Sequence, residues 1–256
     1  MIDGQPSRRI APLPPPLKQP YYGGVRRGRP YPSPCDAKEI LLNGNLPGWG
    51  QRLLLLFGLL QPAAALAHPH SFIAMRSTFI NQAQTLTGVH MRWTMDEMTS
   101  TDLLYDAGDT PAGSVIWKKL AAQVMANVLG QHYFSELYHQ GKRVKFDNLP
   151  PEYHLSREGH KAVLDFVLPL AEPQPLTGQT FTLSTFDSSY FVDMTYKDAS
   201  ALALPPAMAQ SCKVTLTTPN PDASWQEYAR SLDKADAPPD KDLGRQFAQT
   251  VTLTCR

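Results

Sequence analysis

The sequence has few of the features that mark common classes of protein. Its 256 residues contain three cysteines, no internal repeat and no glycine-rich phosphate loop. With 42% hydrophobic residues, the composition excludes a disulfide-dense miniature and a collagen-like fibre. The motifs G-x-S-x-G and H-E-x-x-H are also missing. We identify no catalytic residues and expect a binding protein rather than an enzyme.

Charge is unevenly distributed along the chain, although the formal net charge is only +1. Residues 1–67 hold eight bases and three acids, a net charge of +5, so the other 189 residues carry 16 bases and 20 acids, a net charge of −4. All seven histidines lie in this second segment. A weakly acidic, histidine-bearing segment fits a cation as partner better than nucleic acid or an anionic membrane surface.

Residues 1–67 are expected to form a disordered leader and a signal peptide. Residues 11–34 are rich in Pro, Gly and Arg and lack apolar periodicity. An apolar run over 53–60 follows Arg52, and Ala65-Leu66-Ala67 matches a cleavage site. This run is far shorter than the ~20 residues that span a bilayer. We expect cleavage after Ala67, a single periplasmic domain over 68–256, and, because the signal begins late, a start codon near 40–42.

Export determines how the cysteines are interpreted. Cys35 leaves with the leader, and Cys212 and Cys255 remain in an oxidising compartment. Cys212 begins one run of period-2 alternation and Cys255 ends another, so antiparallel pairing would make the two sulfurs neighbours. We expect a disulfide that closes a C-terminal part of about 211–256. A thiolate metal ligand or a redox pair is less favoured, because C-x-x-C spacing is absent.

Hydrophobic periodicity predicts an α+β fold. Period-2 alternation predicts strands over 89–96, 162–170, 180–186 and 190–196. An i, i+4 stripe predicts an amphipathic helix over 113–130, followed by a second one over 131–139, and a short C-terminal helix is expected over 223–232. The main body is therefore expected to be mainly antiparallel β, a sandwich or an open sheet, with one central helical segment.

Histidines at the new terminus point to metal binding. Cleavage would leave His68-Pro69-His70, with an α-amino group of pKa ~8 beside an imidazole of pKa ~6.5. Pro69 has no amide N–H, which disfavours a square-planar nickel or copper site that uses that amide. Ordinary imidazole ligation by His68 and His70 suits zinc, nickel, cobalt or copper. The alternative is that both histidines merely aid export or solubility.

Other candidate ligands lie in two short segments. On a helix, His132, Glu136 and His139 would share one face, although a solvated polar face is the simpler interpretation. Asp96 and Glu97 close the strand that contains Trp93, where acids are commonly turn formers.

Several stretches together resemble a known family. They are AHPHSFI at 67–73, MRWTMDEMTS at 91–100, HYFSELYHQGKRVKF at 132–146, LDFVLPLAEP at 164–173, FDSSYFVDM at 186–194, SCKVTL at 211–216 and GRQFAQTVTLTC at 244–255. The family is exported, was catalogued as of unknown function, and is described as the periplasmic component of an uncharacterised ABC-type transport system. It includes ZevA-like partners of inner-membrane zinc transporters of the nickel/cobalt-permease type. The resemblance implies His68 and His70 as ligands and Asp96 and Glu97 as further ones.

The sequence therefore predicts a periplasmic accessory protein that binds a divalent metal, zinc first, and works with an inner-membrane metal permease. One alternative is a copper enzyme with an N-terminal histidine chelate and an acid or tyrosine near the metal, for which Asp193 and Tyr190 are candidates. Another is a β-rich adaptor that binds the permease through Tyr190-Phe191 without a metal.

Overall fold

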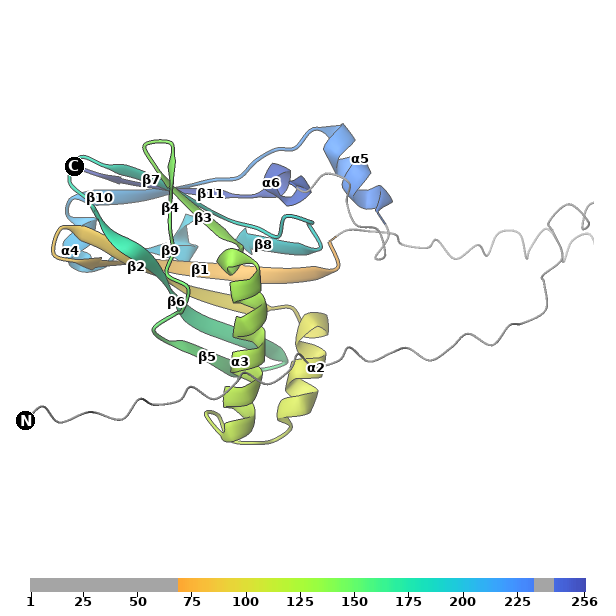
Figure 1. Cartoon of the computed structure of the whole chain (residues 1–256). Coiled ribbons are helices and arrows are strands. Elements are labelled where there is room, and N and C mark those ends of the chain that lie inside the picture. The colour runs from red at the N-terminus through yellow and green to blue at the C-terminus, as the bar shows by residue number, and fades with distance from the viewer. Residues whose placement is uncertain (1–68, 233–241) are drawn as a thin grey trace, which may run out of the picture. The chain divides into compact units, whose positions relative to one another are not determined.

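Two β-sheets, two long α-helices and three short α-helices make up the described part of the chain in a computed structural model, which covers residues 69–232 and 242–256 (Figure 1). The predicted leader and His68 lie outside the described residues. Within these ranges, no helix is both long and apolar enough to cross a membrane.

The elements follow one another with short connections. In chain order they are β1 (Ser71–Gln82), β2 (Thr85–Met95), α2 (Glu97–Ala107), α3 (Val115–Gly130), the 3-10 turn η1 (His132–Phe134), β3 (Ser135–His139), β4 (Lys142–Val144), β5 (Tyr153–Glu158), β6 (Lys161–Pro175), β7 (Thr180–Thr185), β8 (Val192–Tyr196), η2 (Ala199–Ala201), β9 (Leu202–Ala203), α4 (Pro206–Ala209), β10 (Cys212–Thr217), α5 (Ala223–Ser231), α6 (Leu243–Phe247) and β11 (Thr250–Cys255).

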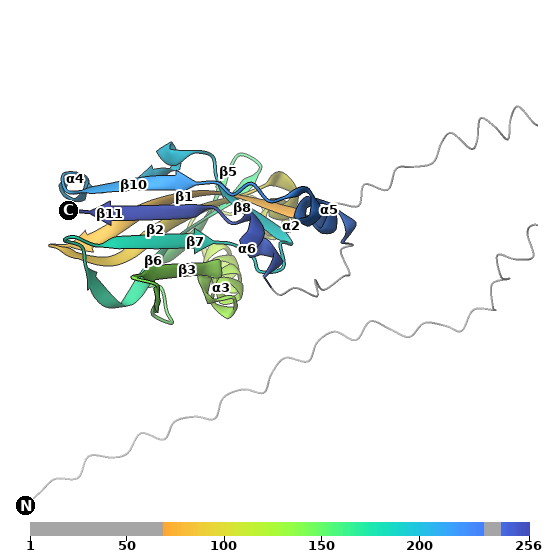
Figure 2. The same ribbon diagram turned by 90° about the horizontal axis from the view of Figure 1, so that it is seen from above.

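The strands form two open sheets. Sheet A has the order β5-β6-β2-β1-β8, with β9 beside the second half of β1, and sheet B has the order β10-β11-β7-β3-β4. Sheet B lies above sheet A in Figure 1, and Figure 2 shows its strands β10, β11 and β7 running side by side. The ladders are antiparallel except where β1 meets β8 and β9. The predicted α+β class with a mainly antiparallel sheet is confirmed.

The core lies between the sheets and the helices. In β2, every second residue from Val89 to Met95 is buried, and Trp93 packs edge-on against Phe166 of β6 with ring centroids 4.9 Å apart. Leu183 of β7 and Leu253 of β11 belong to the same core from sheet B. Each fully buried side chain of this size contributes roughly 1.5–3 kcal/mol to stability. Alternation in the sequence thus identified the inward face of the sheets correctly.

The central helical part consists of α2 and α3, whereas the sequence predicted helices over 113–130 and 131–139. The expected helix over 113–130 is α3, and its Trp117 lies in the core with Leu120 and Met125. The second helix, α2, was not predicted, because its sequence EMTSTDLLYDA has no continuous apolar stripe. Asp96 begins α2 as its N-cap.

The predicted helix over 131–139 is wrong. Chain direction changes after α3 through three consecutive residues with left-handed backbone, His132, Tyr133 and Phe134, at φ 50°, 61° and 51°. Each costs roughly 1–2 kcal/mol relative to a right-handed conformation. Tyr133 is buried, and the chain then continues as β3, in which Ser135 and Leu137 are buried in alternation. Pairing with β7 and burial of aromatic rings stabilise this conformation more than the helical spacing of polar residues would stabilise a helix.

The predicted disulfide is present. Cys212 and Cys255 are register partners in the β10–β11 ladder, and their sulfurs are 2.00 Å apart. Both residues are buried. The span that the bridge closes contains the predicted C-terminal helix, which is α5.

Candidate metal site at the start of β1

His70 lies immediately before β1, where the chain joins β8 at the edge of sheet A. Its backbone N–H donates to the carbonyl of Phe191 at 3.0 Å. The His70 ring packs against the Phe191 ring with centroids 5.1 Å apart. Parallel pairing continues with Phe72 opposite Asp193. The ladder therefore brings His70 beside a segment that also carries a carboxylate.

Asp193 is the one acidic residue in the paired strands β1 and β8. It is partly buried, and burial raises the pKa of its carboxyl group. Met194 is buried, so strand alternation places Asp193 on the opposite, outward face, together with Phe72. Among the described residues, neither a hydrogen-bond donor nor a cation pairs with Asp193. A cation bound here would stabilise the charged form of this carboxylate.

A tight loop before β8 sets the position of Phe191. Both carboxylate oxygens of Asp187 accept hydrogen bonds within the loop, including those from the N–H of Phe191 at 3.0 Å and of Val192 at 3.1 Å. Gly244 of α6 packs against this loop, and a Cβ at Gly244 would lie 1.8 Å from the Asp187 carbonyl oxygen. Only glycine therefore fits where α6 supports the loop.

Tyr190 belongs to the same loop but is held by stacking. Its ring stacks on Phe247 of α6 with centroids 4.0 Å apart. Burial, and secondarily the charge of Asp193, raise the pKa of Tyr190 to about 12. At neutral pH this phenol is protonated, so Tyr190 is a poor anionic ligand but a possible hydrogen-bond donor.

Asp96 and Glu97 occupy structural or exposed positions. Asp96 accepts hydrogen bonds from the N–H of Phe72 at 2.7 Å and from the N–H and hydroxyl of Thr99 at 2.8 and 2.7 Å. Burial opposes the charged form, but these hydrogen bonds outweigh it and lower the pKa of Asp96. Glu97 is exposed in the first turn of α2, where an acid stabilises the helix. Asp96 serves as a cap that also ties α2 to β1.

The structure separates the cluster of His132, Glu136 and His139. His132 is exposed on the left-handed turn, while Glu136 and His139 differ by an odd number of residues in β3 and lie on opposite faces. Glu136 pairs with Arg245 at 2.7 Å and with Arg143 at 3.7 Å. The Nε2 of His139 lies 2.8 Å from the Gln179 side-chain oxygen, and its ring stacks on Phe181. These three residues do not form a common ligand set.

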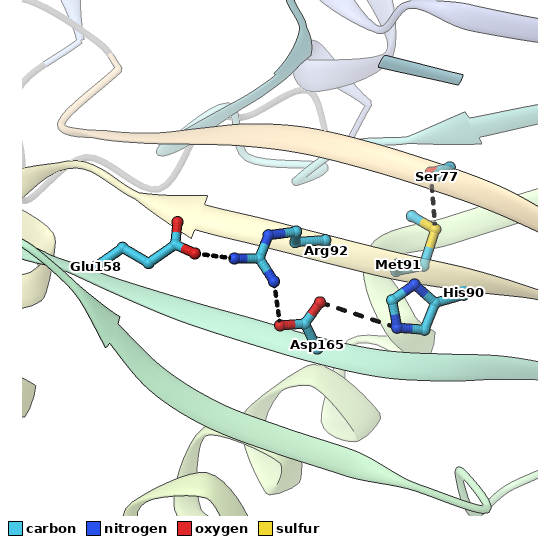
Figure 3. A network of polar contacts seen from close by, with 6 residues as sticks. All are labelled: Ser77, His90, Met91, Arg92, Glu158 and Asp165. Carbon is cyan, nitrogen blue, oxygen red and sulfur yellow. Dashed lines mark hydrogen bonds and ion pairs between the residues drawn. The ribbon is translucent and has the colours of Figure 1, made fainter. Parts of the chain in front are cut away.

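The polar face of β2 also carries a histidine, shown in Figure 3. The Nε2 of His90 lies 3.8 Å from Asp165, and Arg92 donates to the same carboxylate at 2.6 Å. Arg92 also pairs with Glu158. His90 and Arg92 are two residues apart in β2 and therefore share one face of the strand. The Arg92 guanidinium neutralises the two carboxylates, which leaves little negative charge here to attract a metal ion.

Comparisons with known proteins place the chain in a family. Residues 53–255 match the model of a family described as "Protein of unknown function (DUF1007)". The chain belongs to this family. A Haemophilus influenzae protein described as "Uncharacterized protein" is 39% identical over 202 residues, which cover 78% of this chain and 97% of that protein. No solved structure matches the chain.

Some features of the DUF1007 chain were not predicted from its sequence. Asp187 and Asp193 lie six residues apart in the sequence, but Asp187 holds the loop through hydrogen bonds whereas Asp193 faces outward. The packing of His70 against Phe191 joins segments far apart in the chain, and no local pattern reports it. Within residues 69–232 and 242–256, no three His, Cys, Asp or Glu side chains converge as a metal-binding group.

Proposed function

We propose that this DUF1007 protein is a ZevA-like periplasmic accessory protein that binds a divalent cation, zinc first, and exchanges it with an inner-membrane metal permease. The observation that supports this most is the juxtaposition at the edge of sheet A. There His70 packs beside the strand that presents Asp193, a partly buried carboxylate with no cationic partner among the described residues.

The donor set suits a cargo ion. An imidazole and a carboxylate are ordinary zinc ligands, and nickel, cobalt and copper also accept imidazole. His70 and Asp193 would supply two donors, and His68, two residues earlier in the chain, would add an imidazole and, after cleavage, an α-amino group. Such a site is open, unlike a structural zinc site closed by four protein ligands. An open site allows ligand exchange, which transfer of an ion to a permease requires.

Calorimetric titration of residues 68–256 with Zn²⁺ at pH 7.5 tests this proposal. We expect saturable binding by the wild-type chain and none measurable in the double variant His68→Ala/His70→Ala. Asp193→Asn is expected to weaken binding at least tenfold, on the scale of losing a ligand or its supporting group. His154→Ala is the matched control, because His154 is an exposed histidine on β5, away from this edge.

Three outcomes would contradict the proposal. Unchanged affinity in the double variant would remove the histidines from the site. Absence of zinc, nickel, cobalt and copper binding by the wild-type chain, purified without a histidine tag, would favour the adaptor that works without a metal. Redox-active copper with turnover would instead favour the copper enzyme.

A further inference from the structure

A cavity of about 380 Å³ opens beside the left-handed turn, away from the start of β1. Its lining comes from the end of α3, the turn η1, and the chain from Arg143 to Asn148. Leu129, Tyr133, Val144 and Phe146 supply the apolar part of the wall. The volume lies within the roughly 300–1,000 Å³ that is typical of small-molecule sites.

The walls of this cavity are held in place by aromatic packing. Tyr133 stacks on Phe166 at 6.1 Å and meets Phe146 edge-on at 6.0 Å. The Tyr133 hydroxyl donates to the Asp147 carbonyl at 3.0 Å, which joins the turn to the opposite wall. Phe146 pairs with Leu170 of β6 through an isolated bridge. The cavity is therefore built by the fold before any ligand arrives.

Positive charge at the cavity exceeds negative charge. Arg143 and Lys145 line it, and Asp147 is the one acid in its lining. Lys145 forms no ion pair within the described part of the chain. Arg143 is 3.7 Å from Glu136, but Glu136 is already paired more closely with Arg245, at 2.7 Å. Two guanidinium groups thus share one carboxylate. Glu136 neutralises the charge of Arg143 only in part, so Arg143 can also attract another anion.

We propose that this cavity binds a small organic anion, a carboxylate, sulfonate or phosphate carried on an aromatic or branched apolar group. The apolar part would pack on Leu129, Val144 and Phe146, and the acid group would meet Arg143 and Lys145. The same positive charge disfavours a metal ion at exposed His132, which also lines the cavity.

Anilinonaphthalene sulfonate, an aromatic sulfonate that fluoresces in apolar sites, is the probe for the test. The folded chain of residues 68–256 is titrated with this dye and, separately, with its uncharged counterpart phenylnaphthylamine. We expect saturable one-to-one binding of the sulfonate and at least fivefold weaker binding of the uncharged dye. Backbone amide NMR shifts are expected to change at Leu129, Val144 and Phe146.

Variants separate this cavity from general surface binding. Arg143→Gln/Lys145→Gln is expected to weaken sulfonate binding at least tenfold, and Leu129→Trp, which fills the cavity, is expected to abolish binding of both dyes. Lys142→Gln removes one positive charge next to Arg143 in β4, outside the lining, and should leave affinity within twofold. Near-ultraviolet circular dichroism confirms that each variant is folded. Absence of saturable binding, equal affinity for both dyes, or equal effects of the lining variant and Lys142→Gln would overturn the proposal.

Discussion

The pKa values of the carboxylates in this protein differ because their immediate neighbours differ. Glu136 lies under Arg245 and Arg143, and the hydrogen bond from Arg245 is the largest cause of its lowered pKa. Asp193 is partly buried without such a partner, and burial raises its pKa. A paired carboxylate stabilises the fold at neutral pH, whereas an unpaired one is available to a cation. The difference separates a structural acid from a candidate ligand.

The lowered pKa of Glu136 predicts that the stability of the fold depends on pH. The pKa of Glu136 in the folded state is below its ordinary value, so the contribution of this group is present above the unfolded pKa of ~4.3 and is lost as pH falls through the lower folded value. We expect Glu136→Gln to decrease the free energy of unfolding by about 1 kcal/mol at pH 7, since the pair is partly solvated. The difference from the wild-type chain should shrink steadily below pH ~5.

Urea denaturation at pH 7 and at several acidic values measures this effect. Glu172→Gln is the control, because Glu172 is exposed and forms no ion pair among the described residues. The free energy of unfolding of this variant should equal that of the wild-type chain at every pH. A constant difference between Glu136→Gln and the wild-type chain from neutral to acidic pH would show that the ion pair is not the cause.

At the scale of elements, β3 shows how tertiary pairing decides between two local patterns. The segment over 132–139 has polar residues at helical spacing, yet residues 135–139 also alternate in burial along β3. The strand pairs with β7 on one side and β4 on the other. Two ladders and the burial of Leu137 outweigh the few tenths of a kcal/mol that side-chain pairs give an isolated helix.

Removal of the disulfide between β10 and β11 is expected to lower the stability of the fold. The bridge closes a span of 43 residues, for which the chain-entropy model gives a stabilisation of roughly 4 kcal/mol. We expect Cys212→Ala/Cys255→Ala to lower the free energy of unfolding by about that amount in urea denaturation. A reductant should produce a similar loss in the wild-type chain and no change in the variant. A loss below about 1 kcal/mol in both would mean that the bridge constrains the unfolded chain little.

At the scale of the whole molecule, the two proposed sites have opposite charge preferences. The edge of sheet A, where β8 pairs with the start of β1, presents Asp193 without a cationic partner among the described residues, while the cavity beside η1 presents Arg143 and Lys145. The net charge of −4 over residues 68–256 conceals this separation. A cation and an organic anion could therefore bind the same domain without competing for one site.

The predicted cleavage after Ala67 determines the expected mass of the exported chain. After export, we expect the intact mass to equal that of residues 68–256 less the two hydrogens lost in the disulfide. Ala65→Leu/Ala67→Leu replaces the small residues of the cleavage motif and should leave the leader attached. Ala63→Leu, outside the A-x-A motif, is the control and should be processed normally. A wild-type mass that begins before or after His68 would contradict the predicted terminus.

Much of the fold was predictable from periodicity. Alternation located β2, β6, β7 and β11, and the i, i+4 stripe located α3, because burial of one face leaves a regular trace in the sequence. In β1 the outward residues include Phe72 and Ile80 beside Arg76, so its alternation is weak and the strand was not predicted. The cap at Asp96 begins a helix whose own sequence has little amphipathic pattern.

Local sequence patterns were enough to identify the inward-facing residues, the strands on which the two cysteines meet, and the histidines that follow the predicted cleavage site. Three contacts instead depend on the folding of distant segments: His70 beside the strand of Asp193, Glu136 with Arg245, and the turn at 132–134 against the cavity wall. Periodicity depends on neighbours along one element, whereas these contacts join residues from distant elements. Such contacts arise from sheet order and register, which no local pattern specifies.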